Sequence, residues 1–172
     1  MNWILCGREH LEEIRAIFNE AIVNSTALYD YEPRSVEVME AWFAAKEKNG
    51  LPVNGVTNGA GAVMGFATYG PVGAFPGYKY TVEHSVYVDQ RHRGHGLGRL
   101  LLEKIIEAAE MGGYRTMIGV IDAQNAASIA LHERLGFNRC GEIRQAGFKF
   151  GRWLDLVFYQ KLLSGPEHPV DG

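Results

Sequence analysis

Thr81–Arg99 reads TVEHSVYVDQRHRGHGLGR. Apolar and β-branched residues alternate with polar ones over 82–88, which predicts a β-strand. Glycines follow at alternate positions: Gly94, Gly96 and Gly98. An apolar-periodic helix begins near Leu97. A strand, a glycine-rich turn and a helix N-terminus together favour phosphate binding, because glycines admit close backbone approach and the unpaired N–H groups face the anion. We therefore predict a pyrophosphate-binding turn, with Glu83 near the chemistry.

Composition restricts the possible classes of protein. The chain has 172 residues, of which 47% are apolar and 22% charged, as in an ordinary globular domain. The net charge of −3 argues against a nucleic-acid binder. Within this acidic chain, Gln90–Leu102 carries three arginines and no acid. This local positive patch favours a small anionic ligand.

The targeting and cysteine patterns predict a cytoplasmic protein. The sequence shows neither a signal peptide nor an apolar run of membrane-spanning length, so we expect no membrane partner. Cys6 and Cys140 have no metal or framework spacing, which favours two reduced thiols and no metal site.

The order of elements predicts a mixed α/β sheet, antiparallel at first, with a parallel crossover around residues 82–121. We expect an edge strand, two helices, a hairpin, the strand and helix above, a buried strand, a helix and two closing strands. Their predicted ranges are 3–6, 10–22, a second helix from Ser35 to Asn49, 52–57, 62–69, 82–88, 97–111, 116–121, 125–135, 143–148 and 153–160. The domain is predicted to span 1–163, with a disordered tail at 164–172.

Two well-known nucleotide turns do not fit the glycine run. A Walker loop requires Gly-Lys-Ser/Thr, whereas Gly98 is followed by Arg99. A Rossmann turn requires a third glycine at the position of Arg99. A purely structural glycine turn stays open as an alternative.

Two linked motifs carry a family resemblance. The run from Arg91 to Gly96, RHRGHG, resembles the (Gln/Arg)-x-x-Gly-x-(Gly/Ala) signature of the GCN5-related N-acetyltransferases. The pattern Asn125-x-x-Ser-x-x-Leu-His-x-x-x-Gly-Phe137 resembles that superfamily's second motif at the expected separation. Thr81–Val88 and Ala146–Asp155 resemble its phosphinothricin and methionine sulfoximine acetyltransferase branch. The resemblance implies a single-domain fold with a splayed central sheet flanked by helices.

The resemblance implies that acetyl-CoA is the co-substrate and that no metal is needed. The cofactor would lie where strand 82–88 splays from strand 116–121, with the backbone of 86–88 pairing to the pantetheine amides. Backbone amides of 94–99 would hold the pyrophosphate, and Arg91, Arg93 or Arg99 would add charge-assisted bonds. Asn125 would contact the pantetheine arm, cap a helix, or do both. The expected cofactor-binding residues are Val86, Tyr87, Val88, Arg93, Gly94, His95, Gly96, Leu97, Gly98, Arg99, Asn125 and Arg134.

The expected catalytic residues are Glu83 and His132. Acetyl transfer requires a neutral amine, and partial burial beside Val82 would raise the pKa of Glu83 toward that of a useful general base. The alternative is a surface glutamate at a strand end. His132 would protonate the leaving thiolate or contact CoA, or else be a satisfied helical histidine. On a strand His84 points away from Glu83, so only one of the two faces the cleft. Neither cysteine lies near a motif, which favours direct transfer in a ternary complex.

The acceptor is implied to be a small amino-acid-like amine of the phosphinothricin or methionine sulfoximine type. The loop over 70–79 departs from the branch, because Val72 and Gly73 replace a Trp-Arg pair. If that arginine binds the acceptor carboxylate, Lys79 or Arg152 would have to substitute. The expected substrate-binding residues are Gly73, Ala74, Phe75, Glu83, His84 and Ser85. The resemblance also implies a homodimer. Alternatives are a peptide or protein N-terminal or lysine acetyltransferase and a non-catalytic acyl-CoA-binding module.

Overall fold

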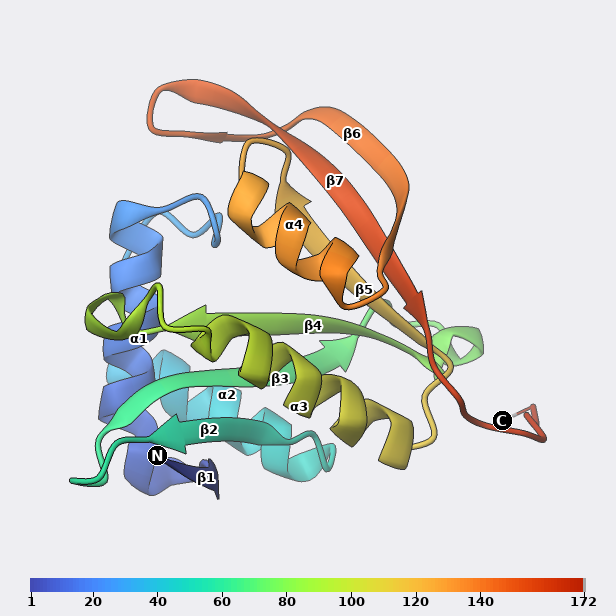
Figure 1. Ribbon diagram of the computed structural model, residues 1–172, viewed down its shortest axis with the longest axis horizontal. Coiled ribbons are helices and arrows are strands. Elements are labelled where there is room, and N and C mark those ends of the chain that lie inside the picture. Colours follow the sequence, from blue (N-terminus) through green and yellow to red (C-terminus); the bar gives the residue numbers. More distant parts are fainter. Residues whose placement is uncertain (172) are drawn as a thin grey trace. The chain divides into compact units, whose positions relative to one another are not determined.

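A computed structural model describes residues 1–171, and Figure 1 shows its elements. Three short 3₁₀ turns, at Arg8–His10, Pro76–Tyr78 and Gln90–His92, accompany the helices and strands. Among the described residues, no helix is both long and apolar enough to span a bilayer. In chain order the elements are β1 (Asn2–Leu5), α1 (Leu11–Asn24), α2 (Val36–Lys48), β2 (Val53–Thr57), β3 (Val63–Pro71), β4 (Thr81–Val88), α3 (Leu97–Met111), β5 (Thr116–Asp122), α4 (Ala126–Arg134), β6 (Asn138–Lys149) and β7 (Arg152–Leu162).

The strands form a mixed sheet in the order β1-β2-β3-β4-β5-β7-β6. Strands β1 and β2 pair antiparallel, as do β2 and β3. Strand β5 pairs parallel with β4 and antiparallel with β7, which in turn pairs antiparallel with β6. The predicted mixed α/β class is therefore confirmed, as is the antiparallel start followed by one parallel crossover.

The chain divides into two compact units, of which the first comprises residues 1–69 and 85–105. Its core is aromatic: the ring of Phe18 lies 4.9 Å from those of Phe66 and Tyr87 and 5.4 Å from that of Trp42, between centroids. Helix α1 contributes because its apolar residues recur at helical spacing and are buried together. Helix α2 begins where Ser35 accepts a hydrogen bond from the backbone N–H of Val38, as its sequence predicts.

The second unit comprises residues 70–84 and 106–172, and its most extended part is the β6–β7 hairpin (Figure 1). Both strands are longer than predicted: β6 begins at Asn138 rather than 143, and β7 ends at Leu162 rather than 160. Nearly every residue of β6 is exposed, so the strand carries no buried alternation that a sequence could reveal. Two register irregularities, between Arg139 and Gly141 and between Ile143 and Gly147, obscure the pattern further.

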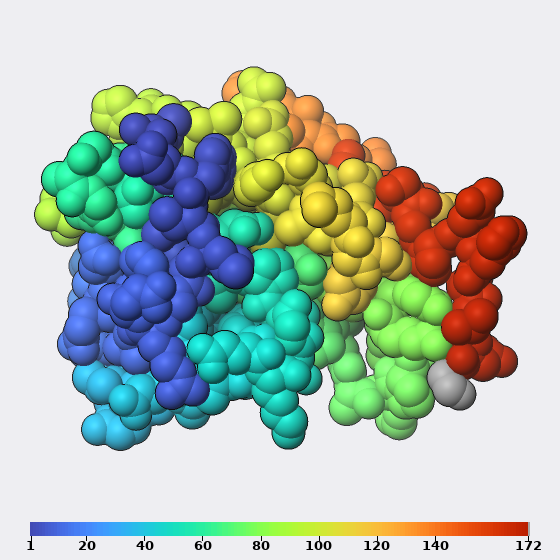
Figure 2. Space-filling model, turned by 90° about the horizontal axis from the view of Figure 1, so that it is seen from below, coloured from blue at the N-terminus to red at the C-terminus, as the bar shows by residue number. Residues whose placement is uncertain are grey.

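The C-terminal segment lies beside the residues that precede β4. The Tyr80 hydroxyl accepts a hydrogen bond from the backbone N–H of Val170 (3.1 Å) and donates one to its carbonyl (3.3 Å). Figure 2 shows this red segment against the green residues near position 80. Together they line a hollow of about 690 Å³ that includes Arg115 and Glu167.

Replacing Phe66 by alanine tests the aromatic core of the first unit. Phe66 is fully buried and its ring contacts Phe18 and Tyr87. The lost burial and the remaining cavity should lower the free energy of unfolding by about 3–5 kcal/mol, measured by urea denaturation. As a control, Leu5→Ala removes a side chain that is 69% exposed and should change it by less than about 0.5 kcal/mol. Equal losses in the two variants would contradict this assignment of the core.

Candidate functional site

The glycine turn joins the end of β4 to the start of α3. The Asp89 backbone N–H donates to the carbonyl of Met64 on β3 (2.9 Å), which fixes the entry to the turn. Gly94 and Gly96 have φ angles of +81° and +79°, a region that side chains disfavour. The carbonyl of Gly96 then accepts hydrogen bonds from the N–H groups of Arg99 and Leu100 as the helix begins. The first-turn amides of such a helix favour an anion.

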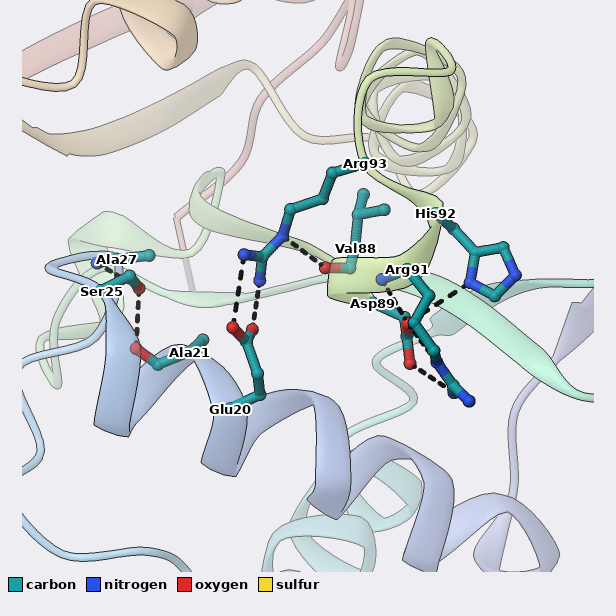
Figure 3. Close-up of polar contacts among 9 residues, drawn as sticks. All are labelled: Glu20, Ala21, Ser25, Ala27, Val88, Asp89, Arg91, His92 and Arg93. Atoms are coloured by element: carbon teal, nitrogen blue, oxygen red, sulfur yellow. Dashed lines mark hydrogen bonds and ion pairs between the residues drawn. The ribbon is translucent and has the colours of Figure 1, made fainter.

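The three arginines around this turn each lie against an acid (Figure 3 shows the first two). Arg91 forms a two-pronged bond to Asp89, with N···O distances of 2.8 and 2.9 Å. Arg93 donates to the Val88 carbonyl (3.1 Å) and pairs with Glu20 of α1. Arg99 pairs with Glu103 one helical turn later (2.8 Å).

The structure adds to the predicted positive patch that each of its three arginines is paired with a carboxylate. Its count of charges from 90 to 102 omitted Asp89 and Glu103, which lie just outside that window, and Glu20, which lies far away in sequence. The arginines are correspondingly committed to carboxylates in this structure. Any charge-assisted bonds that they make to a ligand would exchange with these ion pairs.

Asp89 shows the strength of the local ion pairing. Its carboxylate also accepts the backbone N–H of Arg91 (2.8 Å) and approaches the His92 ring (3.4 Å), as Figure 3 shows. Hydrogen bonding from the Arg91 side chain is the main cause that lowers the pKa of Asp89 to about 2. Asp89 is thus charged throughout the neutral range and holds the turn closed at its entry.

Alternation along β4 decides which of the expected cofactor contacts point inward. The ring of Tyr87 lies in the aromatic core, and its neighbours Val86 and Val88 are half-buried. The side chain of Tyr87 is therefore occupied by core packing, and only the backbone of residues 86–88 is available to pair with a ligand. The expectation that its amides pair with pantetheine stays a prediction, as do the roles of the exposed His95, the buried Leu97 and the half-buried Gly98.

Glu83 belongs to the second unit, at the point where the parallel register ends. Strand β4 pairs with β5 over Thr81–Glu83 and Thr116–Ile118. The Glu83 side chain is exposed, whereas its neighbours Val82 and His84 are buried. Partial desolvation by the surrounding packing nevertheless raises the pKa of the Glu83 carboxyl. Glu83 therefore combines access to solvent with a carboxylate that is a stronger base than usual.

His84 and His132 form a buried pair within the same unit. Their Nε2 atoms lie 3.0 Å apart, and their rings stack at an angle of 22°. Nδ1 of His132 lies 2.7 Å from the backbone carbonyl of Ser128. Burial is the main cause that lowers the pKa of both imidazoles, that of His84 to about 3. The structure thus places these two expected site residues together, on the side of β4 away from Glu83.

The remaining expected residues lie apart from this pair. Asn125 caps α4, because its Oδ1 accepts the N–H of Ser128 at 3.1 Å, so the capping interpretation is confirmed. Arg134 is exposed at the end of that helix. The loop at 73–75 is also exposed, with Phe75 at 75%. Ser85 is half-buried on β4. Of the two cations considered for an acceptor, Arg152 faces the buried Asp122 (3.5 Å) and Lys79 lies over the Tyr80 ring.

Sequence reasoning missed three features of the site. Glu20 pairs with Arg93 across 73 positions, and no local pattern marks it. The His84–His132 pair joins residues 48 positions apart. Gly119 borders that pair, and no sequence signal distinguishes it from an ordinary strand glycine. Within residues 1–171, no group of three or more His, Cys, Asp or Glu side chains could hold a metal ion.

Comparison with known proteins connects this geometry to a family. Residues 11–137 match the Acetyltransferase (GNAT) family. Over 154 residues the chain is 46% identical to an L-methionine sulfoximine/L-methionine sulfone acetyltransferase from Pseudomonas paraeruginosa PA7, covering 90% of each protein.

Two solved structures share the fold closely. One is a GNAT superfamily phosphinothricin acetyltransferase from Sinorhizobium meliloti in complex with acetyl-CoA, with 33% identity, a TM-score of 0.94, and coverage of 99% of this chain and 92% of that one. The other is a ribosomal-protein-alanine N-acetyltransferase from Brucella melitensis, with 40% identity, a TM-score of 0.92, and coverage of 95% and 100%.

The ion pair at the entry to the turn predicts a pH-dependent stability difference. Because folding lowers the pKa of Asp89, its charged form stabilises the fold above the unfolded-state pKa, and this contribution is lost as the pH falls through about 2. Asp89→Asn should therefore cost about 1 kcal/mol at pH 7, after allowance for solvent screening at the exposed Arg91. Urea denaturation at pH 7 and at pH 2.5 should show the difference from wild type shrinking in acid. A difference that is constant with pH would contradict the ion-pair explanation.

Proposed function

The chain belongs to the Acetyltransferase (GNAT) family, and we propose that it transfers the acetyl group of acetyl-CoA to the amine of a small amino-acid-like acceptor. The observation that carries the acceptor class is the 46% identity, over nine-tenths of both chains, to a methionine sulfoximine/methionine sulfone acetyltransferase. The Sinorhizobium relative, a phosphinothricin acetyltransferase, supports the same class. Acceptors of the phosphinothricin or methionine sulfoximine type are therefore proposed.

The glycine turn has the chemistry required for the pyrophosphate of acetyl-CoA. The positive φ angles of Gly94 and Gly96 leave backbone where side chains would otherwise stand, and no atom lies within 4 Å of a Cβ built on either residue. The N-terminus of α3 adds the backbone amides of its first turn and the favourable end of the helix dipole. Bound acetyl-CoA supplies the thioester carbonyl that the amine attacks. Residues 94–99 are proposed to hold its phosphates through backbone N–H groups.

Glu83 is proposed as the general base. An acceptor amine is an ammonium ion at neutral pH, and it must lose a proton before it can attack a carbonyl. A carboxylate at its usual pKa removes that proton poorly, whereas the desolvation at Glu83 raises the pKa toward the working range. Its exposed position on β4 leaves the carboxylate accessible to an acceptor.

Direct transfer is proposed rather than an acyl-cysteine intermediate. Burial is the main cause that raises the pKa of Cys6 to about 12, with Glu13 and Glu9 adding to it, so this thiol is not ionised at neutral pH. Cys140 is exposed on β6, and its Sγ donates to the carbonyl of Phe158. His132 is proposed to serve the leaving sulfur, either as its proton donor or by contact with CoA, and Asn125 to contact the pantetheine arm.

A second candidate acceptor is the α-amine of a protein. The Brucella structure, a ribosomal-protein-alanine N-acetyltransferase that is 40% identical to this chain, favours it. Free amino acids and protein N-termini both offer an α-amine. The α-carboxyl group is a free carboxylate in an amino acid but part of a peptide bond in a protein N-terminus. The altered loop at 70–79, with Val72 and Gly73 in place of Trp-Arg, bears on this choice because an acceptor carboxylate needs a cationic partner.

A CoA-release assay tests the function. The panel comprises phosphinothricin, methionine sulfoximine, methionine sulfone, free L-amino acids, a peptide with an N-terminal alanine and a polyamine. We expect the amino-acid analogues to be turned over with the highest kcat/KM. Turnover of the peptide alone would establish the second candidate. Tight acetyl-CoA binding without turnover of any acceptor would indicate a non-catalytic module.

A cytoplasmic homodimer is proposed for the assembly. The β6–β7 hairpin exposes large apolar side chains, and burial of such side chains against a second copy would remove apolar surface from water. They are Ile143, Phe148, Phe150, Trp153 and Leu162, each 46–64% exposed. Sedimentation equilibrium should give twice the chain mass, and Trp153→Glu should shift the protein toward the monomer. A monomeric wild type would contradict the proposal.

Replacing Glu83 by glutamine tests the proposed base. The amide keeps the size of the side chain but cannot take a proton, so kcat should fall by about 10²- to 10⁴-fold while the Kd for acetyl-CoA is unchanged. In wild type kcat should rise with pH through the raised pKa of Glu83, and this limb should be absent in the variant. Glu110→Gln, at an exposed position on α3, is the matched control and should retain wild-type kinetics. A Glu83→Gln enzyme with normal rate and pH profile would exclude this base.

A further inference from the structure

The four ring nitrogens of the His84–His132 pair have unequal surroundings. The Ser128 carbonyl can only accept, so the 2.7 Å contact requires a proton on Nδ1 of His132. In a neutral ring, Nε2 of His132 is then a bare acceptor. The 3.0 Å contact between the two Nε2 atoms must hold one proton, which therefore belongs to His84. Nδ1 of His84 is left bare.

That last nitrogen is an unpaired polar atom in the interior. His84 is 8% exposed, and among residues 1–171 its Nδ1 has no hydrogen-bond partner. The two rings are closed in by aromatic neighbours: His84 lies 5.6 Å and His132 5.1 Å from the Phe137 ring, and His132 lies 6.3 Å from the Tyr159 ring. Buried polar groups normally find partners, so the bare Nδ1 marks the pair as more than packing.

Charged groups on the surrounding elements have partners of their own. On α4, Glu133 accepts the Tyr159 hydroxyl of β7 at 2.9 Å. Asp122 of β5 faces Arg152, and Arg134 is exposed. Glu83 precedes His84 on β4 but points to the other face. The two imidazoles are therefore held uncharged by burial, and burial is the first cause of the lowered pKa of each.

Gly119 makes room for the contact between the rings. A Cβ built on Gly119 would lie 2.9 Å from Nε2 of His132 and 2.9 Å from Nε2 of His84. Such distances are shorter than real contacts allow, so a side chain here would force at least one of the two rings to move. Three elements thus converge on one hydrogen bond: β4 through His84, α4 through His132 and β5 through Gly119.

We propose that His84 is a positioning residue for the acetyl transfer, because its Nε2–H fixes His132 in one orientation and one tautomer. His132 then carries its proton on Nδ1 and offers Nε2 to no partner other than His84. Any further proton must enter the pair at Nδ1 of His84, which is the one nitrogen not already bonded. Protonation of His132 is thereby controlled by a residue 48 positions away. The inference rests on the proposed contact of His132 with CoA, since both ring nitrogens of His132 are already hydrogen-bonded.

The first test reads the tautomers in the resting protein, without substrate. In ¹⁵N-labelled protein, two-bond proton–nitrogen spectra should show His132 as the Nδ1–H form and His84 as the Nε2–H form, assigned through His84→Gln and His132→Gln. Both rings should stay neutral where an ordinary histidine, with a pKa near about 6.5, becomes charged, because burial lowers the pKa of each. The opposite tautomer at His132, or an ordinary titration of either ring, would overturn the proposal.

The second test separates positioning from simple packing. Glutamine at 84 can still donate an amide N–H to Nε2 of His132, whereas leucine fills similar space without a donor. His84→Gln should keep kcat within about threefold of wild type, and His84→Leu should lower it by about tenfold or more. In His84→Leu the freed Nε2 of His132 can take a proton, so the kcat profile should gain a titration that the wild type lacks. Equal rates in the two variants would overturn the role of the hydrogen bond.

Gly119→Ala provides a variant that leaves both histidines in place. It should reproduce the kinetic defect and the new titration of His84→Leu by separating the rings, and a normal rate and tautomer pattern would contradict the geometry. The tautomer spectra do not depend on activity, so the proposed function and the proposed role of His84 can fail separately. Inactivity of the wild type toward every acceptor, with the expected tautomers intact, would overturn the function and the catalytic role of His84 but leave the pairing.

Discussion

Strand β4 imposes the constraint on which the site depends, because its side chains must alternate while its backbone stays paired. Its parallel register with β5 covers the three pairs from Thr81–Thr116 to Glu83–Ile118. This anchoring fixes Glu83 on one face and His84 on the other. A slip of one residue would bury the carboxylate and expose the imidazole, and it would also remove Tyr87 from the aromatic core. The positions of Glu83 and His84 and the packing of Tyr87 therefore depend on the same pairing register of β4.

Fixed and exchangeable parts of the glycine turn have different roles. The backbone is fixed: Asp89 closes the entry, and the positive φ angles of Gly94 and Gly96 set the path into α3. The Arg99 side chain is exchangeable, because an exposed ion pair such as Arg99–Glu103 stabilises a fold by only about 0–1 kcal/mol. An incoming phosphate could displace such a carboxylate at little cost. In the proposed complex with acetyl-CoA, the specificity for an anion accordingly comes from the amides of the turn, and the arginines adjust its charge.

Local patterns predicted most of the fold. The alternation that begins at Val82, the helical spacing after Leu11 and the cap at Ser35 each act over a few residues, and β4, α1 and α2 form where they predict. The same logic failed where no side-chain pattern exists, as in the exposed strand β6. It also failed for contacts between distant segments: Glu20 with Arg93 and His84 with His132 depend on how α1, α4 and β4 pack. The candidate residues could thus be named from sequence, but their partners could not.

The paired residues at 83 and 84 show how one physical cause gives two chemistries. Desolvation disfavours charge of either sign, so it raises the pKa of the Glu83 carboxyl and lowers that of the His84 imidazole. The carboxylate becomes a stronger base while the imidazole becomes a weaker one, although the two are adjacent in the chain. In the proposed reaction, a proton released by the acceptor amine therefore goes to Glu83 and not to the histidine pair. Because the pair does not compete for that proton in the proposed reaction, His132 keeps its hydrogen bonds while Glu83 takes the proton.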